Sequence, residues 1–209
     1  MTRRPRTCVF LLLTLVVASC LSLSGSAAAQ VLYQDQEIQV HDLASLMAHS
    51  HDPSDVLLTS LDTVFHDKEI CCGRDSALED SAQAADPKSL KDVASKLEGR
   101  HLLSDGRPIK VTAEYLTPDA VTASHVVTMV ANQHAPLMQW NGHLYVVHAV
   151  VYVWISQDDV NGVNTMAIRK FLLWDTRFSD SRRAVVFDRE KEDPSSVQGL
   201  LFVQVEPQN

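Results

Sequence analysis

The residues best suited to chemistry begin with two adjacent cysteines, Cys71 and Cys72, followed by Gly73. They stand at the start of a helix predicted over 72–84. A thiol at a helix N-terminus lies near unpaired backbone N–H groups and the positive end of the helix dipole, which favour the thiolate. The same N–H groups can stabilise an oxyanion. The pair therefore indicates a nucleophile; the alternatives are two small apolar core residues or a strained disulfide between neighbours.

A candidate base for this nucleophile, and a carboxylate that can orient that base, lie at two long apolar segments, 143–155 and 165–174, which the sequence predicts to pair as a hairpin. His143 directly follows Asn141-Gly142, the strongest two-residue hairpin signal. Asp175 directly follows the second segment, so pairing would bring it to the same open end as His143. A carboxylate at that position can hold an imidazole in one tautomer, which is the third role of a catalytic triad.

Strand periodicity separates two histidines of the first segment. His143 and His148 are five residues apart, and successive side chains of a strand point to opposite faces. At most one of the two histidines therefore faces a given site.

The order and spacing of these motifs resemble the papain-like cysteine peptidases, in particular the compact bacterial branch related to bacteriocin-leader peptidases. In that branch a Cys-Gly opens a helix, an apolar strand containing Gly-His follows much later, and the next apolar strand ends in Asp. The corresponding segments here are Cys72-Gly73, 136–147 and 172–175. The resemblance implies a triad in which Cys72 is the nucleophile, His143 the general base and acid, and Asp175 the residue that orients the imidazole.

The first 29 residues are typical of a secretory signal peptide. Three arginines among the first six residues precede an apolar stretch over 8–23, and three alanines end the segment. The stretch is short for a membrane-spanning helix, and no later segment is long and apolar enough to span a bilayer. Val17-Ala18-Ser19-Cys20 resembles a lipobox, so a lipid anchor at Cys20 is the alternative. We expect a periplasmic or secreted protein, with a membrane-anchored lipoprotein as the alternative.

The net charge and the cysteine and histidine contents exclude several classes of partner and ligand. The net charge is −8 and becomes −11 without the signal peptide, because three arginines leave with it and no acidic residue does. Such a surface disfavours nucleic acid as a partner. Two of the four cysteines leave as well, so the mature chain is not a disulfide scaffold. None of the nine histidines forms the i, i+4 pattern of a zinc helix, and we expect no metal and no cofactor.

Hydrophobic periodicity predicts mostly helices in the first half and strands in the second. Leu90, Val93, Ala94 and Leu97 form one face of a predicted helix. The predicted fold class is α+β and papain-like, with a helical N-terminal half packed on a C-terminal antiparallel sheet. The predicted helices are 41–50, 53–65, 72–84, one that Gly99 ends, and one after Pro118; the predicted strands are 109–116, 135–140, 143–155, 165–174, 183–188 and 199–205.

The predicted organisation has three parts. Residues 1–29 are the signal peptide, residues 30–65 an N-terminal arm with short helices, and residues 66–209 the papain-like domain. Residues 30–209 together form one globular unit.

Two functions from different classes follow. The first is an exported cysteine peptidase-like protein that hydrolyses a peptide or amide bond of a peptide or protein substrate through Cys72, His143 and Asp175. The alternative is a catalytically inactive exported binding or structural module of the same fold. The alternative gains weight because the Gln that the family usually places before the nucleophile does not occur between His51 and Cys71.

Overall fold

The computed structural model describes residues 34–40, 56–65, 76–86, 88–156, 164–178 and 183–208. Contacts group Tyr33–Asn209 into one compact unit. Four predicted features lie outside the described residues: the signal peptide, the lipid anchor at Cys20, the helix over 41–50, and the nucleophile pair Cys71 and Cys72.

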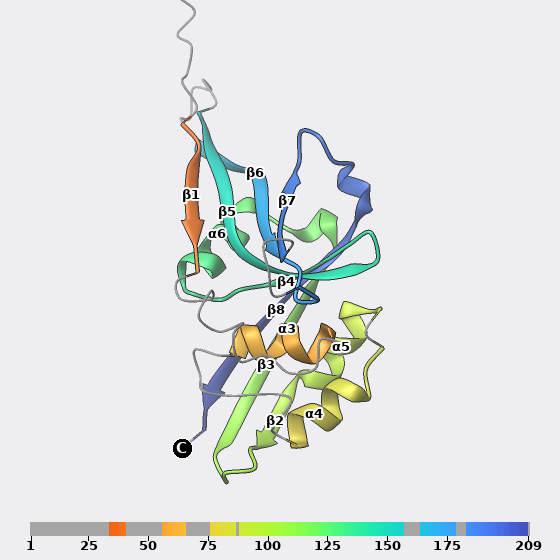
Figure 1. The fold of residues 1–209 in the computed structure, drawn as a ribbon. Coiled ribbons are helices and arrows are strands. Elements are labelled where there is room, and N and C mark those ends of the chain that lie inside the picture. Colours follow the sequence, from red (N-terminus) through yellow and green to blue (C-terminus); the bar gives the residue numbers. More distant parts are fainter. Residues whose placement is uncertain are drawn as a thin grey trace, which may run out of the picture. The chain divides into compact units, whose positions relative to one another are not determined.

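The centre of the fold is one eight-stranded sheet in which every pair of neighbours is antiparallel (Figure 1). Its order is β2-β3-β8-β4-β5-β6-β7, and β1 also pairs with β5. The C-terminal strand therefore lies in the middle of the sheet, between β3 and β4. The strands are β1 (Gln36–Gln39), β2 (Gly99–Leu102), β3 (Pro108–Leu116), β4 (Leu137–Trp140), β5 (His143–Ser156), β6 (Asn164–Trp174), β7 (Ala184–Asp188) and β8 (Val197–Pro207).

Four α-helices and two short 3-10 helices accompany the sheet in the described part of the chain. They are α3 (Val56–Phe65), α4 (Ser76–Gln83), α5 (Leu90–Leu97), η4 (Pro118–Ala120), α6 (Ala123–Ala131) and η6 (Pro194–Ser196). Among the described residues, no helix has the length and apolar character that crossing a membrane requires.

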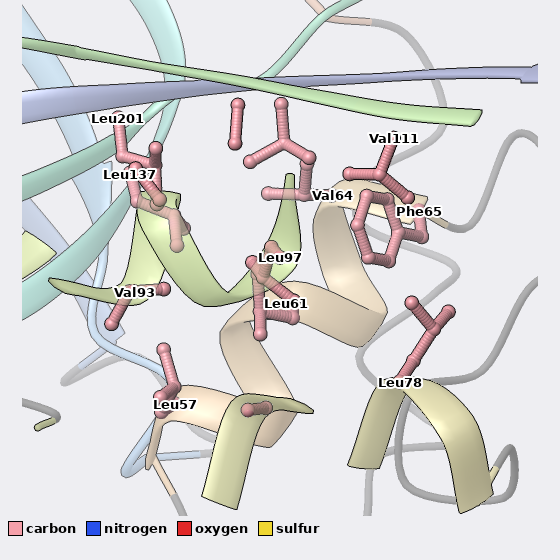
Figure 2. Close-up of a cluster of buried hydrophobic side chains, with 14 of the residues drawn as sticks. Leu57, Leu61, Val64, Phe65, Leu78, Val93, Leu97, Val111, Leu137 and Leu201 are labelled. Carbon is pink, nitrogen blue, oxygen red and sulfur yellow. The ribbon is translucent and has the colours of Figure 1, made fainter. Parts of the chain in front are cut away.

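Helices cover both faces of the sheet. On one face, α3, α4 and α5 form an apolar cluster with alternate residues of β3, β4, β5 and β8. Figure 2 shows this cluster, with Leu61 of α3 and Leu97 of α5 among its central residues. On the other face, α6 packs on β5 and β6, and its apolar residues join the intervening residues of the same central strands. We call these faces the α3–α5 face and the α6 face.

The local sequence explains several of these elements. The four predicted core-facing residues of α5 are all buried, which confirms the predicted helix face. Ser89 caps the helix by accepting a hydrogen bond from the Asp92 N–H at 3.2 Å. Asn141 and Gly142 have φ values of 50° and 74° and join Trp140 to its partner His143, so the predicted two-residue hairpin is confirmed.

The predicted fold class, a papain-like helical N-terminal half packed on a C-terminal antiparallel sheet, is wrong. Of the described residues, 44% lie in strands and 30% in helices, and these helices do not form a separate half. The hairpin of β2 and β3 comes between α5 and α6, and β3 pairs with the C-terminal strand along eight residues. The physical reason is that β3 and β4 each need a neighbour, and β8 satisfies the backbone of both.

We predict that Leu97→Ala lowers the free energy of unfolding by about 3 kcal/mol, because Leu97 is fully buried and its truncation leaves a cavity. Lys96→Ala is the matched control, since Lys96 is exposed on the same helix, and we expect it to change stability by less than about 0.5 kcal/mol. Urea unfolding measures both. Equal effects of the two substitutions would contradict the assigned core.

Candidate functional site

Two of the three predicted catalytic residues come to the same end of one strand pair. Strands β5 and β6 pair antiparallel, with Val146 opposite Trp174, which confirms the predicted pairing. His143 is the first residue of β5, and Asp175 directly follows β6. His143 is exposed, whereas Asp175 is 3% exposed. Cys72, the predicted nucleophile, lies outside the described residues, so the triad as a whole stays a prediction.

Arg177 links His143 to Asp175. Its Nε and Nη2 donate to the two carboxylate oxygens of Asp175 at 2.8 Å and 2.5 Å. Its Nη1 lies 3.1 Å from Nδ1 of His143. The backbone N–H of Arg177 also donates to Asp175 Oδ1 at 3.1 Å. The buried carboxylate therefore holds the guanidinium from one side, and the guanidinium holds the imidazole.

This geometry fixes the tautomer of His143. A guanidinium has only donors, so Nδ1 must accept the hydrogen bond, and the neutral ring carries its hydrogen on Nε2. Arg177 thus contacts both His143 and Asp175, and the catalytic roles predicted for these two residues stay predictions. Arg177 is not among the residues predicted from the sequence; the signal for it is the Asp-x-Arg spacing, because an aspartate carboxylate readily accepts the N–H of the second residue after it.

Tyr145 completes this polar group on the α6 face. Its ring lies 5.7 Å from that of Trp140 and 6.5 Å from that of His143. Burial raises the pKa of the Tyr145 phenol, and the negative charge of Asp175 raises it further, while Arg177 acts in the opposite direction. The phenol is therefore a neutral hydrogen-bond donor at physiological pH. We call His143, Tyr145, Asp175 and Arg177 the polar cluster.

His148 belongs to the opposite face, as strand periodicity predicts. A β-bulge in β5 places it between Val147, opposite Leu173, and Ala149, opposite Leu172. The His148 ring stacks on Trp174, a residue of the α3–α5 face, with 4.6 Å between ring centroids.

The surroundings of His148 oppose its protonation. Burial lowers the pKa of His148, and the nearby charge of Arg183 lowers it further, to about 4. The Arg183 guanidinium itself lies over the Trp174 ring, 4.8 Å from its centroid. His148 is therefore neutral near pH 7.

A cavity of about 440 Å³ lies on the α6 face, and no residue of the polar cluster lines it. Its floor consists of core side chains of β6, β7 and β8, and η4, the start of α6 and η6 form its walls. Only a few polar side chains reach it, which is typical of small-molecule sites. The lining residues with apolar side chains are Pro118, Val121, Ala123, Ile168, Phe171, Phe187, Pro194, Val197 and Leu200, and those with polar side chains are Asp119, Arg189 and Ser195.

The chain matches no family model, no curated protein and no solved structure. Within the described segments, no three His, Cys, Asp or Glu side chains come together as metal ligands would. Among the described residues, the polar cluster and the cavity are the features on which we base the functional argument.

We predict that Arg177→Ala lowers the free energy of unfolding by about 2 kcal/mol, because it leaves the buried Asp175 carboxylate without its cation. The Arg177 side chain is 35% exposed, so water offsets part of the loss. In a double-mutant cycle with Asp175→Asn, we expect a coupling energy of about 1–2 kcal/mol. Strictly additive effects in urea unfolding would show that the two side chains do not interact.

We predict that His148 destabilises the fold in acid. Its pKa is about 4 in the folded state, against 6.5 ordinarily, so between these pH values only the unfolded chain takes up the proton. Stability is then fully present above pH 6.5 and is lost as the pH falls towards 4. His148→Phe keeps a ring on Trp174 without a titrating group.

The measurement for His148 compares urea unfolding of wild type and His148→Phe at pH 7 and pH 4. We expect the wild type to lose about 2 kcal/mol more than the variant between these pH values, a figure that allows for the partial solvent exposure of His148. Parallel stability curves for the two proteins would rule out this role of His148.

Proposed function

We propose that this chain is an exported binding protein that does not hydrolyse peptide bonds. The observation that carries the proposal is the position of Arg177, which engages both His143 Nδ1 and the Asp175 carboxylate. This is the arrangement expected of an inactive module rather than of a thiol hydrolase.

Hydrolysis of a peptide bond by a cysteine nucleophile requires a group that accepts the thiol proton. A general base for a cysteine needs a ring nitrogen with a free lone pair within reach of the thiol. In the neutral ring of His143, Nδ1 uses its lone pair to accept from Arg177, and Nε2 carries the hydrogen. His143 in this state has no lone pair left to accept the thiol proton.

The cavity on the α6 face supports the binding part of the proposal. Its volume of about 440 Å³ lies in the range of small-molecule sites, about 300–1,000 Å³. Apolar side chains from both β6 and β7 form its floor, so the site is built into the sheet.

We predict that the reduced full-length protein cleaves no peptide in a mixed peptide library. We also expect His143→Ala to leave the alkylation rates of Cys71 and Cys72 by iodoacetamide within about twofold of wild type at pH 7, because His143 does not activate either thiol. Nitrogen-15 NMR of the wild type should show His143 as the Nε2–H tautomer.

Arg177→Gln is the control for the tautomer, since its shorter amide side chain no longer spans Asp175 and His143. The NMR signature of His143 should change in this variant, while the fold persists by circular dichroism. Peptide hydrolysis by the wild type that disappears in His143→Ala would overturn the proposed function.

A further inference from the structure

Two hollows adjoin on the outer part of the sheet. The first is the 440 Å³ cavity on the α6 face, and the second, of about 320 Å³, lies over the outer parts of β5 and β6. Ile168 and Arg189 line both hollows. Strand alternation places Val153 and Ala167 on the face opposite to Ile168, so the two hollows lie on different sides of the sheet, and Arg189 stands at the sheet edge between them. The remaining lining residues of the second hollow are Val153, Ile155, Ala167, Arg169 and Glu190.

The strand register explains why the edge of β6 is open beside Arg189. Strand β7 pairs with β6 from Trp174 to Lys170, and Asp188 is its last residue. The register of β5 and β6 then shifts, because Arg169 is an extra residue on β6. The Arg189 N–H donates to the Arg169 carbonyl at 3.0 Å, and the chain turns there. The pairing of β7 with β6 thus ends beside Ile168.

The arginines that line the two hollows differ in how they are paired. Arg169 forms an ion pair with Glu190, and its Nε lies 3.8 Å from Asp35 Oδ1. Arg189 is exposed, and none of the ion pairs among the described residues includes its guanidinium. Its donors remain available for a ligand. A guanidinium binds a carboxylate best, because the two planar groups form parallel hydrogen bonds.

We propose that the 440 Å³ cavity on the α6 face holds a single-chain amphiphile with a carboxylate head group. The alkyl chain lies against Ile168, Phe171 and Phe187, and the carboxylate pairs with Arg189 at the rim of the cavity. Asp119 also lines this cavity, and its negative charge repels the carboxylate and so favours the orientation with the head at Arg189. This inference rests on the proposed binding function but not on the absence of hydrolysis.

The test is isothermal titration of the full-length protein with octanoate, decanoate and dodecanoate, each below its micelle concentration. Because each buried methylene contributes about 0.8 kcal/mol, we expect affinity to rise about fourfold per methylene until the cavity is full. Decanol and decyltrimethylammonium test the head group, and both should bind at least about tenfold more weakly than decanoate.

Variants separate the head group from the chain. Arg189→Gln should weaken decanoate about tenfold and leave decanol unchanged, whereas Asp119→Asn should strengthen decanoate. Arg100→Gln is the matched control, since Arg100 is exposed on β2, at the opposite edge of the sheet from β7, and it should change nothing. Val121→Trp should fill the cavity and weaken decanoate and decanol together. Ala123→Phe serves the same purpose if Val121→Trp does not fold.

Each contrary result has a distinct meaning. Equal binding of decanoate and decanol, unaffected by Arg189→Gln, overturns the carboxylate assignment. Absence of binding by every alkyl compound overturns the inference as a whole. Peptide hydrolysis that depends on His143 overturns the proposed function and leaves the titration results to decide the ligand.

Discussion

Burial of the central strands on both faces is the constraint on which the other features depend. In β4, β5 and β8, alternate residues contribute to the apolar clusters on the α3–α5 face and on the α6 face. Helices must therefore cover both sides, and the chain supplies α3, α4 and α5 to one side and α6 to the other. The polar cluster lies at the ends of β5 and β6, and His148 lies at a register shift of β5.

The sequence predicts local structure well because local structure depends on neighbouring residues. The apolar face of α5, the turn at Asn141-Gly142 and the pairing of β5 with β6 each follow from patterns within about thirty residues. The position of β8 is a different matter, since its partners Ala113 and Leu137 lie far away along the chain. The sequence of an apolar segment does not specify which strands it pairs with. The predicted arrangement, a helical half packed on a separate sheet, is wrong for that reason.

The candidate site shows the same division between local and distant information. Strand pairing brings His143 and Asp175 to one end, as predicted, but the pairing alone does not say what lies between them. Arg177 is two residues from Asp175, and its long side chain can turn to solvent or fold back on the carboxylate. Burial of Asp175 favours the second arrangement, and burial is a property of the packed fold rather than of the sequence pattern. The cavity likewise is lined by residues from distant parts of the chain, which no local motif predicts.

The central position of β8 has a consequence for the order of events during folding. This strand, Val197–Pro207, supplies neighbours to both β3 and β4, although both lie far from it along the chain. Until it pairs, these strands lack the contact that joins the two halves of the sheet. Pairings between distant segments must close long loops and are therefore slow to form. We expect the two halves of the sheet to join late in folding, after local hairpins such as that of β4 and β5 have formed.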